Sequence, residues 1–185
     1  MDRATECYKR YLDGDDGAVR EIMDELFYGL VFFVDRIVRD VHASEDIALD
    51  VISDLFVYKH RFDFRVSIKT YVYMRGKSRA LNYVRRRKRI SYTELSKAEA
   101  FPDERAELES IVLKGERKRA VDAAVDELPE DMRAAVHLVY FERMSYADAA
   151  KVMGKNRKQI DNLLFRAKKE LASSLGEAGR ALLDQ

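Results

Sequence analysis

The segment from Phe64 to Arg89 has the composition of a surface that could hold a nucleic-acid strand. It contains ten Lys or Arg residues and no Asp or Glu, and four aromatic residues stand among them: Phe64, Tyr71, Tyr73 and Tyr83. Cationic side chains attract a phosphate backbone, and flat aromatic rings stack on unpaired bases. The alternative is a solvated helix face whose aromatic residues turn into a core, which is the usual meaning of an isolated basic run.

A second stretch, residues 146–163, has the spacing of a helix-turn-helix. Ala149 and Ala150 are small enough for two helices to approach, and Gly154 stands at the turn, where a positive φ costs glycine little. We expect Asn156 to cap the second helix, whose early residues are polar: Arg157, Lys158, Gln159, Asp161 and Asn162. Such residues suit base edges or phosphates in a major groove. The alternative is a three-helix packing module that binds no DNA.

The residues that usually carry catalysis or bind metals are few and scattered. His42, His60 and His137 lie on different predicted elements with no triad or metal-ligand spacing, and Cys7 is the only cysteine. Neither a glycine-rich phosphate loop nor a helical HExxH motif occurs. We therefore expect no enzyme, no catalytic residues, no cofactor and no bound metal.

The composition predicts an all-α protein that remains in the cytoplasm. Only two of the 185 residues are Pro and eight are Gly, while 47% are hydrophobic and 36% are charged, which favours a helical, soluble protein. No apolar run approaches the roughly 18–20 residues that span a bilayer. The N-terminus lacks the apolar core of a signal peptide.

The net charge of +1 conceals four segments of opposite sign. Residues 21–63 carry ten acids against four Lys or Arg, and residues 94–109 carry six acids against two. Residues 64–93 hold ten bases and no acid, and residues 151–169 hold seven bases opposed only by Asp161. Two basic surfaces separated by acidic ones indicate two contacts with nucleic acid and at least one with a protein.

The first ninety residues predict a compact helical domain. Apolar residues recur at helical spacing in the expected helices, which cover residues 3–12, 18–40 and 45–60. We expect Ser44 to cap the third helix, whose exposed flank is acidic and comprises Glu45, Asp46, Asp50 and Asp54. After an irregular loop, Ser67 should cap a helix over residues 68–89, whose basic side must face water or a ligand.

The composition changes after residue 90. Residues 91–117 are acidic, contain Pro102 and predict a linker, with an ordinary spacer as the bland alternative. The helical pattern resumes at Ala120, breaks at Pro129 and continues over EDMRAAVHLVYFE until Arg143-Met144 closes that helix. Ser145 should then cap the next helix. A second helical domain is therefore expected over 118–176, followed by a short tail at 177–185.

Two blocks of this sequence resemble the RNA polymerase sigma factors of the extracytoplasmic-function (ECF) group. In the first, SEDIALDVISDLFVYKHRFDF is similar to the group's AEDIVQDVF-type helix, and SIKTYVYMRGKSRALNYVRRRKR is similar to its FKTWLYRIARNKALNYLRRR-type helix. In the second, ELPEDMRAAVHLVYFERMSYADAAKVMG is similar to LPERQREVFLLRYFEGLSYEEIAEILG, and KNRKQIDNLLFRAKKEL to the variant recognition helix KQIDNALQRAKKKL. The order and distance of the blocks match the compact two-domain ECF layout.

The resemblance implies two small helical domains joined by a flexible acidic linker. Sigma region 2 would cover 1–90 and region 4 would cover 118–176. Such a protein binds core RNA polymerase, at the β′ coiled coil and the β flap, and directs transcription from promoter DNA. An anti-sigma factor is the expected regulator, and no membrane insertion is expected.

The resemblance also assigns residues to each contact. Core polymerase would be bound by Glu45, Asp46, Asp50 and Asp54. The melted −10 element, from which one base is flipped out, would be held by Phe64, Tyr71, Tyr73, Lys77, Ser78, Arg79, Asn82, Arg85, Arg86, Arg87, Lys88 and Arg89. The −35 duplex would be read by Lys155, Asn156, Arg157, Lys158, Gln159, Asp161, Asn162 and Arg166.

The chain departs from the ECF pattern in its long basic helix. Tyr71 stands where the group commonly has Trp, and Arg75-Gly76-Lys77-Ser78 replaces Ile-Ala-Arg-Asn, which leaves the identity of the −10 bases open. Gly76 within a helix costs about 1 kcal/mol relative to Ala, so it suggests close approach by a backbone or a base.

The rival function is a stand-alone helix-turn-helix regulator that binds duplex DNA without polymerase. That reading leaves the basic aromatic helix without a purpose, and such a regulator usually needs a dimer to span two half-sites.

Overall fold

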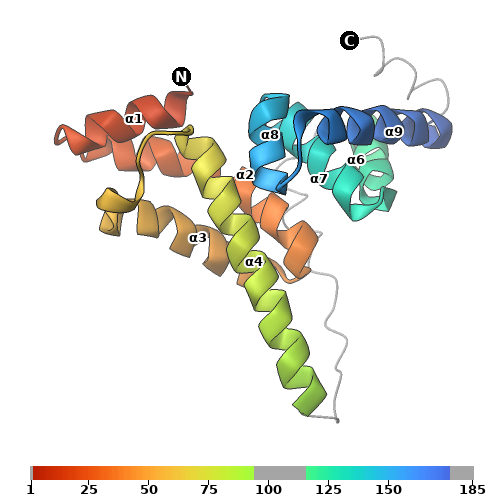
Figure 1. Cartoon of the computed structure of the whole chain (residues 1–185), viewed down its shortest axis with the longest axis horizontal. Coiled ribbons are helices and arrows are strands. Elements are labelled where there is room, and N and C mark those ends of the chain that lie inside the picture. The colour runs from red at the N-terminus through yellow and green to blue at the C-terminus, as the bar shows by residue number, and fades with distance from the viewer. Residues whose placement is uncertain (1, 94–115, 176–185) are drawn as a thin grey trace. The chain divides into compact units, whose positions relative to one another are not determined.

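The computed structural model describes residues 2–93 and 116–175. Every regular element within these residues is a helix, so the predicted all-α fold is confirmed (Figure 1). The chain divides into two compact units, Met1–Ala100 and Phe101–Gln185. Most of the predicted linker at 91–117 and the whole of the predicted tail at 177–185 lie outside the described residues.

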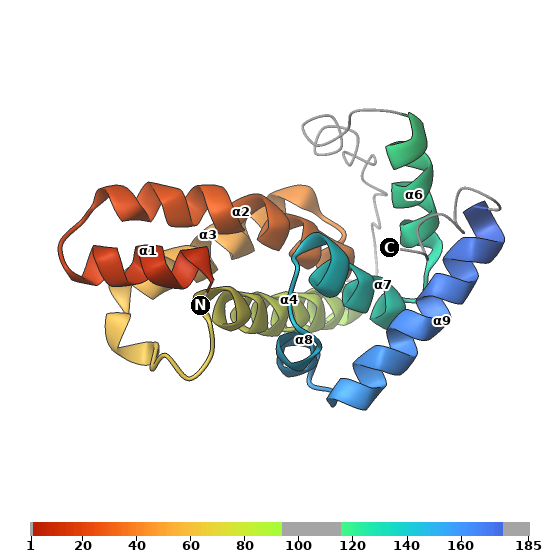
Figure 2. The same cartoon turned by 90° about the horizontal axis from the view of Figure 1, so that it is seen from above.

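In the described part of the first unit, the second helix packs against the first, third and fourth helices. The elements of this part are α1 (Arg3–Leu12), α2 (Gly17–Val38), α3 (Val41–Val57), the short 3-10 helix η1 (Lys59–Arg61) and α4 (Ile68–Thr93). Helix α2 contacts α1, α3 and α4, and Figure 2 shows α1 running alongside it. The C-terminal half of α4 extends past the ends of α2 and α3 (Figure 1), so its basic residues lie away from the core.

Helices α2 and α4 meet closely at Gly76. This residue is buried, and a Cβ atom added to it would lie 2.7 Å from Leu30 Cδ1 and 3.5 Å from Val34 Cγ2. The close approach expected from the sequence is therefore present. The neighbours, however, are side chains of α2 rather than a backbone segment or a base. Helix α4 packs on the rest of the unit through a buried stripe at four-residue spacing, which comprises Ile68, Val72, Gly76 and Ala80.

The predicted N-cap of the third helix is wrong by one turn. Helix α3 begins at Val41, and the side chain of Asp40 accepts a hydrogen bond from the Ala43 amide at 3.0 Å. Ser44 is fully buried within the helix, where its hydroxyl donates to the Asp40 carbonyl at 2.7 Å. Aspartate and serine are both good N-caps, and Asp40, the earlier of the two residues, caps this helix. Glu45 consequently lies beyond the first turn.

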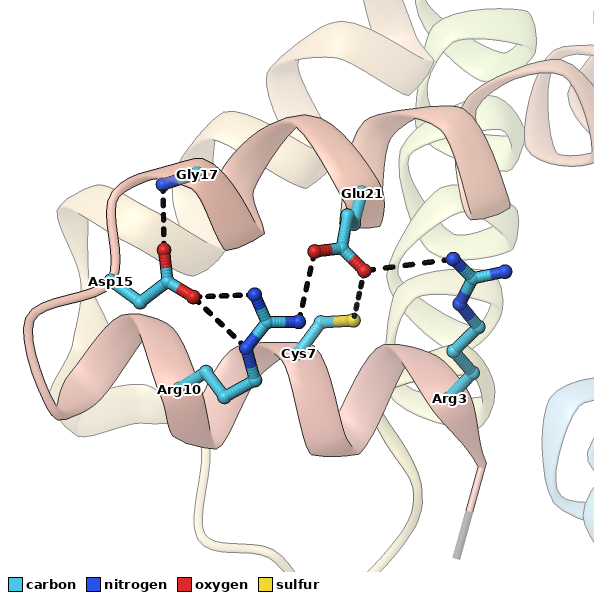
Figure 3. Close-up of polar contacts among 6 residues, drawn as sticks. All are labelled: Arg3, Cys7, Arg10, Asp15, Gly17 and Glu21. Atoms are coloured by element: carbon cyan, nitrogen blue, oxygen red, sulfur yellow. Dashed lines mark hydrogen bonds and ion pairs between the residues drawn. The ribbon is translucent and has the colours of Figure 1, made fainter.

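A polar network fastens α1 to the start of α2 (Figure 3). The Arg10 guanidinium donates from Nε to Asp15 Oδ2 at 2.9 Å and from Nη1 to Glu21 Oε1 at 2.8 Å. These hydrogen bonds hold the pKa of both carboxyl groups below their ordinary values. Cys7 Sγ lies 3.6 Å from Glu21 Oε2, and burial is the main reason that the pKa of this thiol is raised. A protonated, buried thiol is a poor nucleophile.

The described part of the second unit has a helix-turn-helix as its last two helices. Its elements are α6 (Glu116–Glu127), α7 (Glu130–Val136), the π-helix η2 (His137–Phe141), α8 (Tyr146–Met153) and α9 (Arg157–Leu175). Helix α9 contacts α6, α7 and α8. Its buried residues Ile160, Leu164 and Ala167 form the contact stripe.

The predicted helix break, helix cap and turn of the second unit are confirmed. Pro129 precedes α7, and Ser145 caps α8 by accepting a hydrogen bond from the Asp148 amide at 3.1 Å. Gly154 ends α8 with a φ of 67°, the left-handed conformation that glycine adopts at least cost. Ala149 and Ala150 are buried, as two closely approaching helices require. The π-helix was not predicted.

Candidate nucleic-acid interface

Helix α4 presents one continuous polar face beyond its core contacts. The exposed residues of this face recur at helical spacing and comprise Arg75, Ser78, Asn82, Arg85, Arg86 and Arg89, with Arg87 and Lys88 exposed beside them. Tyr71 is half-buried at the N-terminal end of this face, and Lys77 is half-buried to one side of it. The side chains of this part of α4 can therefore meet a phosphate backbone along one side of the helix.

Tyr73 does not belong to this face. Its side chain is 0% exposed and its ring centroid lies 5.3 Å from that of Phe33 on α2. A ring in the core cannot stack on a base, so the prediction that Tyr73 contacts DNA is corrected here. The cause is its position next to the buried stripe of α4, immediately after Val72.

The side chain of Arg79 is paired with helix α3. Its Nη1 donates to Asp50 Oδ2 at 2.7 Å, and its Nη2 donates to Asp54 Oδ2 at 2.6 Å. The sequence assigned this arginine to DNA and the two aspartates to a protein partner. The structure instead joins them across α3 and α4, and no local pattern could have predicted a pairing between helices.

Phe64, in the loop that precedes α4, belongs to a cluster of aromatic residues. Its backbone has a φ of 59°, a conformation that bulky residues rarely adopt and that marks local strain. The ring lies 4.6 Å from Phe62 and 6.1 Å from Tyr8, between centroids. The side chain is still 43% exposed. Packing on buried neighbours therefore fixes an aromatic ring at the surface, near α1, where Lys9 Nζ lies 5.9 Å from the ring centroid.

Helix α1 holds the loop that carries Phe64, which the sequence did not reveal. The Ile68 amide donates to Thr5 Oγ1 at 2.9 Å, and the Tyr8 hydroxyl donates to the Leu55 carbonyl at 2.9 Å. Ser67 caps α4 as predicted, by accepting from the Thr70 amide at 3.1 Å. The loop is thus anchored on both sides by buried hydrogen bonds. Contacts over 63 residues of sequence leave no local signal.

Helix α3 carries the acidic surface. Asp46 and Asp50 are exposed, whereas Glu45 and Asp54 are half-buried. Two apolar residues lie among the exposed positions of the same helix: Leu49 at 49% and Val57 at 70% exposure. Leu49 follows Asp46, and Val57 follows Asp50, at helical spacing. This spacing was the signal in the sequence that the two apolar residues share a side of the helix with the aspartates. The mixed face suits a protein partner better than a purely acidic surface would.

Helix α9 begins with a capping box. The Asn156 side chain accepts from the Gln159 amide at 2.9 Å, and the Gln159 side chain accepts from the Asn156 amide at 2.8 Å. The predicted cap is therefore confirmed, and the side chain of Gln159 is engaged in the same box. The remaining predicted contact residues of α9 are exposed: Arg157, Lys158, Asp161, Asn162 and Arg166.

Lys155, just before α9, and Phe165 on α9 differ in their exposure. Lys155 is half-buried and its Nζ lies 3.0 Å from Asp131 Oδ2. Phe165 is 72% exposed on α9, at helical spacing from Lys158 and Asn162, and was not predicted. An exposed phenyl ring on a groove-reading helix can contact a thymine methyl group. Its spacing from those polar residues was the available signal.

Other kinds of site find no support in the part of the chain that is described. None of the described residues form a cluster of three or more His, Cys, Asp or Glu side chains that could hold a metal ion. A search of the same residues reveals no helix long and apolar enough to cross a membrane.

Comparisons with known proteins point to one kind of protein. Residues 118–171 match the family Sigma-70, region 4. The chain is 22% identical to the ECF RNA polymerase sigma factor SigM of Bacillus subtilis (strain 168), over 75% of this chain and 83% of that protein. It is 26% identical to the RNA polymerase sigma-H factor of Pseudomonas aeruginosa, over 92% of each.

A solved structure has the same fold. The sigma factor RpoE of Bartonella quintana, crystallised with the anti-sigma factor NepR, aligns with a TM-score of 0.64. The alignment covers 85% of this chain and 96% of that one at 17% sequence identity. The likeness therefore extends over both helical units of the chain.

Proposed function

We infer that this chain belongs to the extracytoplasmic-function group of RNA polymerase sigma factors, and that it binds core RNA polymerase and directs promoter-specific initiation of transcription. The observation that carries this conclusion is the presence of two different exposed basic faces in one chain, on α4 and on α9. Relatives that are sigma factors match it over both units, including one over 92% of each sequence. A regulator that used the helix-turn-helix alone would need only the second unit.

We assign the first face, α4 with the loop before it, to the melted −10 element. Ser78, Asn82 and the cluster from Arg85 to Arg89 lie exposed along α4, where bases and phosphates can reach them. The loop before α4 contributes the exposed ring of Phe64, held by Phe62, as a stacking surface. Stacking on an aromatic ring recovers roughly 1–3 kcal/mol per base, which offsets the cost of taking a base out of the duplex.

We assign the second face, the N-terminal half of α9, to the −35 element as duplex. A capped, rigid helix with exposed Arg157, Lys158 and Asn162 fits a major groove. The arginine and lysine suit guanine edges or phosphates, and the amide suits adenine. Because Gln159 is held in the capping box, we place it as a positioning residue rather than as a base contact.

We assign the mixed acidic and apolar face of α3 to core polymerase. Its exposed members are Asp46, Leu49, Asp50 and Val57. Apolar residues supply the buried centre of such an interface, and carboxylates supply steering and orientation. We also propose regulation by an anti-sigma factor, since the structurally similar RpoE is bound to one. In this account the protein works in the cytoplasm and catalyses no reaction, because polymerase makes the RNA.

Run-off transcription tests the proposal. Core polymerase would be supplied with the purified chain and with fragments of its own genome, and the transcripts would be mapped. We expect a small set of start sites that require the chain, and permanganate-reactive thymines near −10 that mark the melted strand. Start sites that are the same with and without the chain would contradict the proposal.

A further inference from the structure

Arg79 lies between two surfaces that the proposed function gives to different partners. It projects from α4, the helix assigned to the −10 strand, toward α3, the helix assigned to polymerase. Asp50 and Asp54 lie four residues apart on α3, and the guanidinium bonds to Oδ2 of both, at 2.7 and 2.6 Å. One planar group therefore spans a full turn of the polymerase-facing helix.

This geometry separates Arg79 from Arg85 and Arg86 of α4. Its side chain is 32% exposed, whereas Arg85 and Arg86 are exposed on the helix surface. A contact with phosphate would require it to give up two charge-assisted hydrogen bonds, which are about twice as strong as neutral ones. The guanidinium is thus committed to the carboxylates of α3 rather than available to a phosphate.

The same bonds order the acidic surface. The side chain of Asp54 is 24% exposed and that of Asp50 is 70% exposed, so the latter would otherwise sample several rotamers in water. Each aspartate uses only Oδ2 in its bond to Arg79, which leaves Oδ1 to accept from a partner. The rigid fork of arginine fixes both carboxylates together in a way that a lysine ammonium cannot.

We propose that Arg79 is a positioning residue for polymerase docking: it holds the carboxylates of Asp50 and Asp54 in the arrangement that core polymerase binds, and it makes no contact with promoter DNA. The inference rests on the proposed function. It assigns Arg79 to polymerase docking instead of DNA binding, because this residue of α4 acts through the aspartates of α3.

The test compares Arg79→Gln with Arg86→Gln in the full-length chain. Ordering one side chain at an interface lowers the binding affinity roughly 2- to 12-fold. Because the aspartate side chain is short, each aspartate should contribute toward the lower end of that range. Releasing two of them should weaken binding to core polymerase about tenfold in Arg79→Gln. The salt dependence of promoter binding by the holoenzyme should be unchanged. Arg86→Gln should do the reverse, with unchanged polymerase affinity and a salt slope smaller by about one unit.

Two more variants separate positioning from general stability. Arg79→Lys, which can reach one carboxylate, should recover part of the lost affinity. In an Asp54→Asn background, Arg79→Gln should cost at most about threefold, because one of the two side chains it orders has lost its charge. Thermal unfolding of each variant identifies any that fail to fold, and Arg79→Lys then carries the comparison.

Several results would overturn the proposal. Unchanged polymerase affinity in Arg79→Gln, with only a lower melting temperature, would mean a structural ion pair. Tighter polymerase binding would mean that Arg79 masks the carboxylates. A salt slope reduced by about one unit would return Arg79 to the DNA face. If the wild-type chain itself fails to bind core polymerase, the proposed function fails and the role of Arg79 fails with it.

Discussion

Replacing Gly76 with Ala tests whether α2 and α4 meet as closely as described. In an exposed helix this change stabilises by about 1 kcal/mol, because glycine is the poorer helix former. Here the new Cβ would lie 2.7 Å from Leu30 Cδ1 and 3.5 Å from Val34 Cγ2. Both side chains are fully buried, so neither can swing into solvent. Overpacking costs about 1–3 kcal/mol, and we expect a net loss of about 1 kcal/mol.

Amide hydrogen exchange read by mass spectrometry localises this loss. Peptides from α2 and α4 should exchange about fivefold faster in Gly76→Ala, which corresponds to about 1 kcal/mol. Peptides from α8 and α9, which belong to the other unit, serve as the internal control. Space made by Leu30→Ala should reverse the sign, so that adding Gly76→Ala to that variant stabilises by up to about 1 kcal/mol. Stabilisation in the wild-type background would refute the close contact.

Four other substitutions test the capping box, the groove face and the N-terminal network. Asn156→Ala should destabilise the second unit by about 1 kcal/mol through loss of the capping box, seen as faster exchange at the start of α9 with polymerase binding unaffected. Arg157→Gln and Lys158→Gln should each lower the salt slope of promoter binding by about one unit, and an unchanged slope in both would contradict the groove assignment. Arg10→Gln should lower the melting temperature at neutral pH. Because Arg10 depresses the pKa of two carboxyl groups whose ordinary values are 3.8 and 4.5, this difference should be complete above those values and vanish as the pH falls through the lowered ones. A pH series of thermal unfolding curves measures it.

Most of the helical framework could be predicted from the sequence because its signals are local. The first helix was expected over residues 3–12, and α1 covers those residues. Ser67, Ser145 and Asn156 act as caps in the structure, since a short polar side chain before an apolar periodic run has few other uses. Ser44 misled the prediction because Asp40, one turn earlier, is also a good cap.

The errors at the candidate site arise from contacts between helices. Tyr73 looked available because it stands among basic residues in the sequence, yet its register places it beside the buried stripe. The bonds from Arg79 to Asp50 and Asp54 span 29 and 25 residues, and charge alone does not say which acid an arginine meets. The anchoring of the Phe64 loop by α1 is similarly non-local. Tertiary packing, rather than composition, decides which polar groups remain exposed.

The dependence of promoter binding on polymerase tests the central claim most directly. The isolated chain, core polymerase and their mixture would each be incubated with a mapped promoter fragment and examined by gel shift and footprinting. We predict sequence-specific protection of both the −35 and −10 elements only in the mixture. Tight, sequence-specific binding of the duplex promoter by the isolated chain would instead identify a stand-alone regulator and contradict the account.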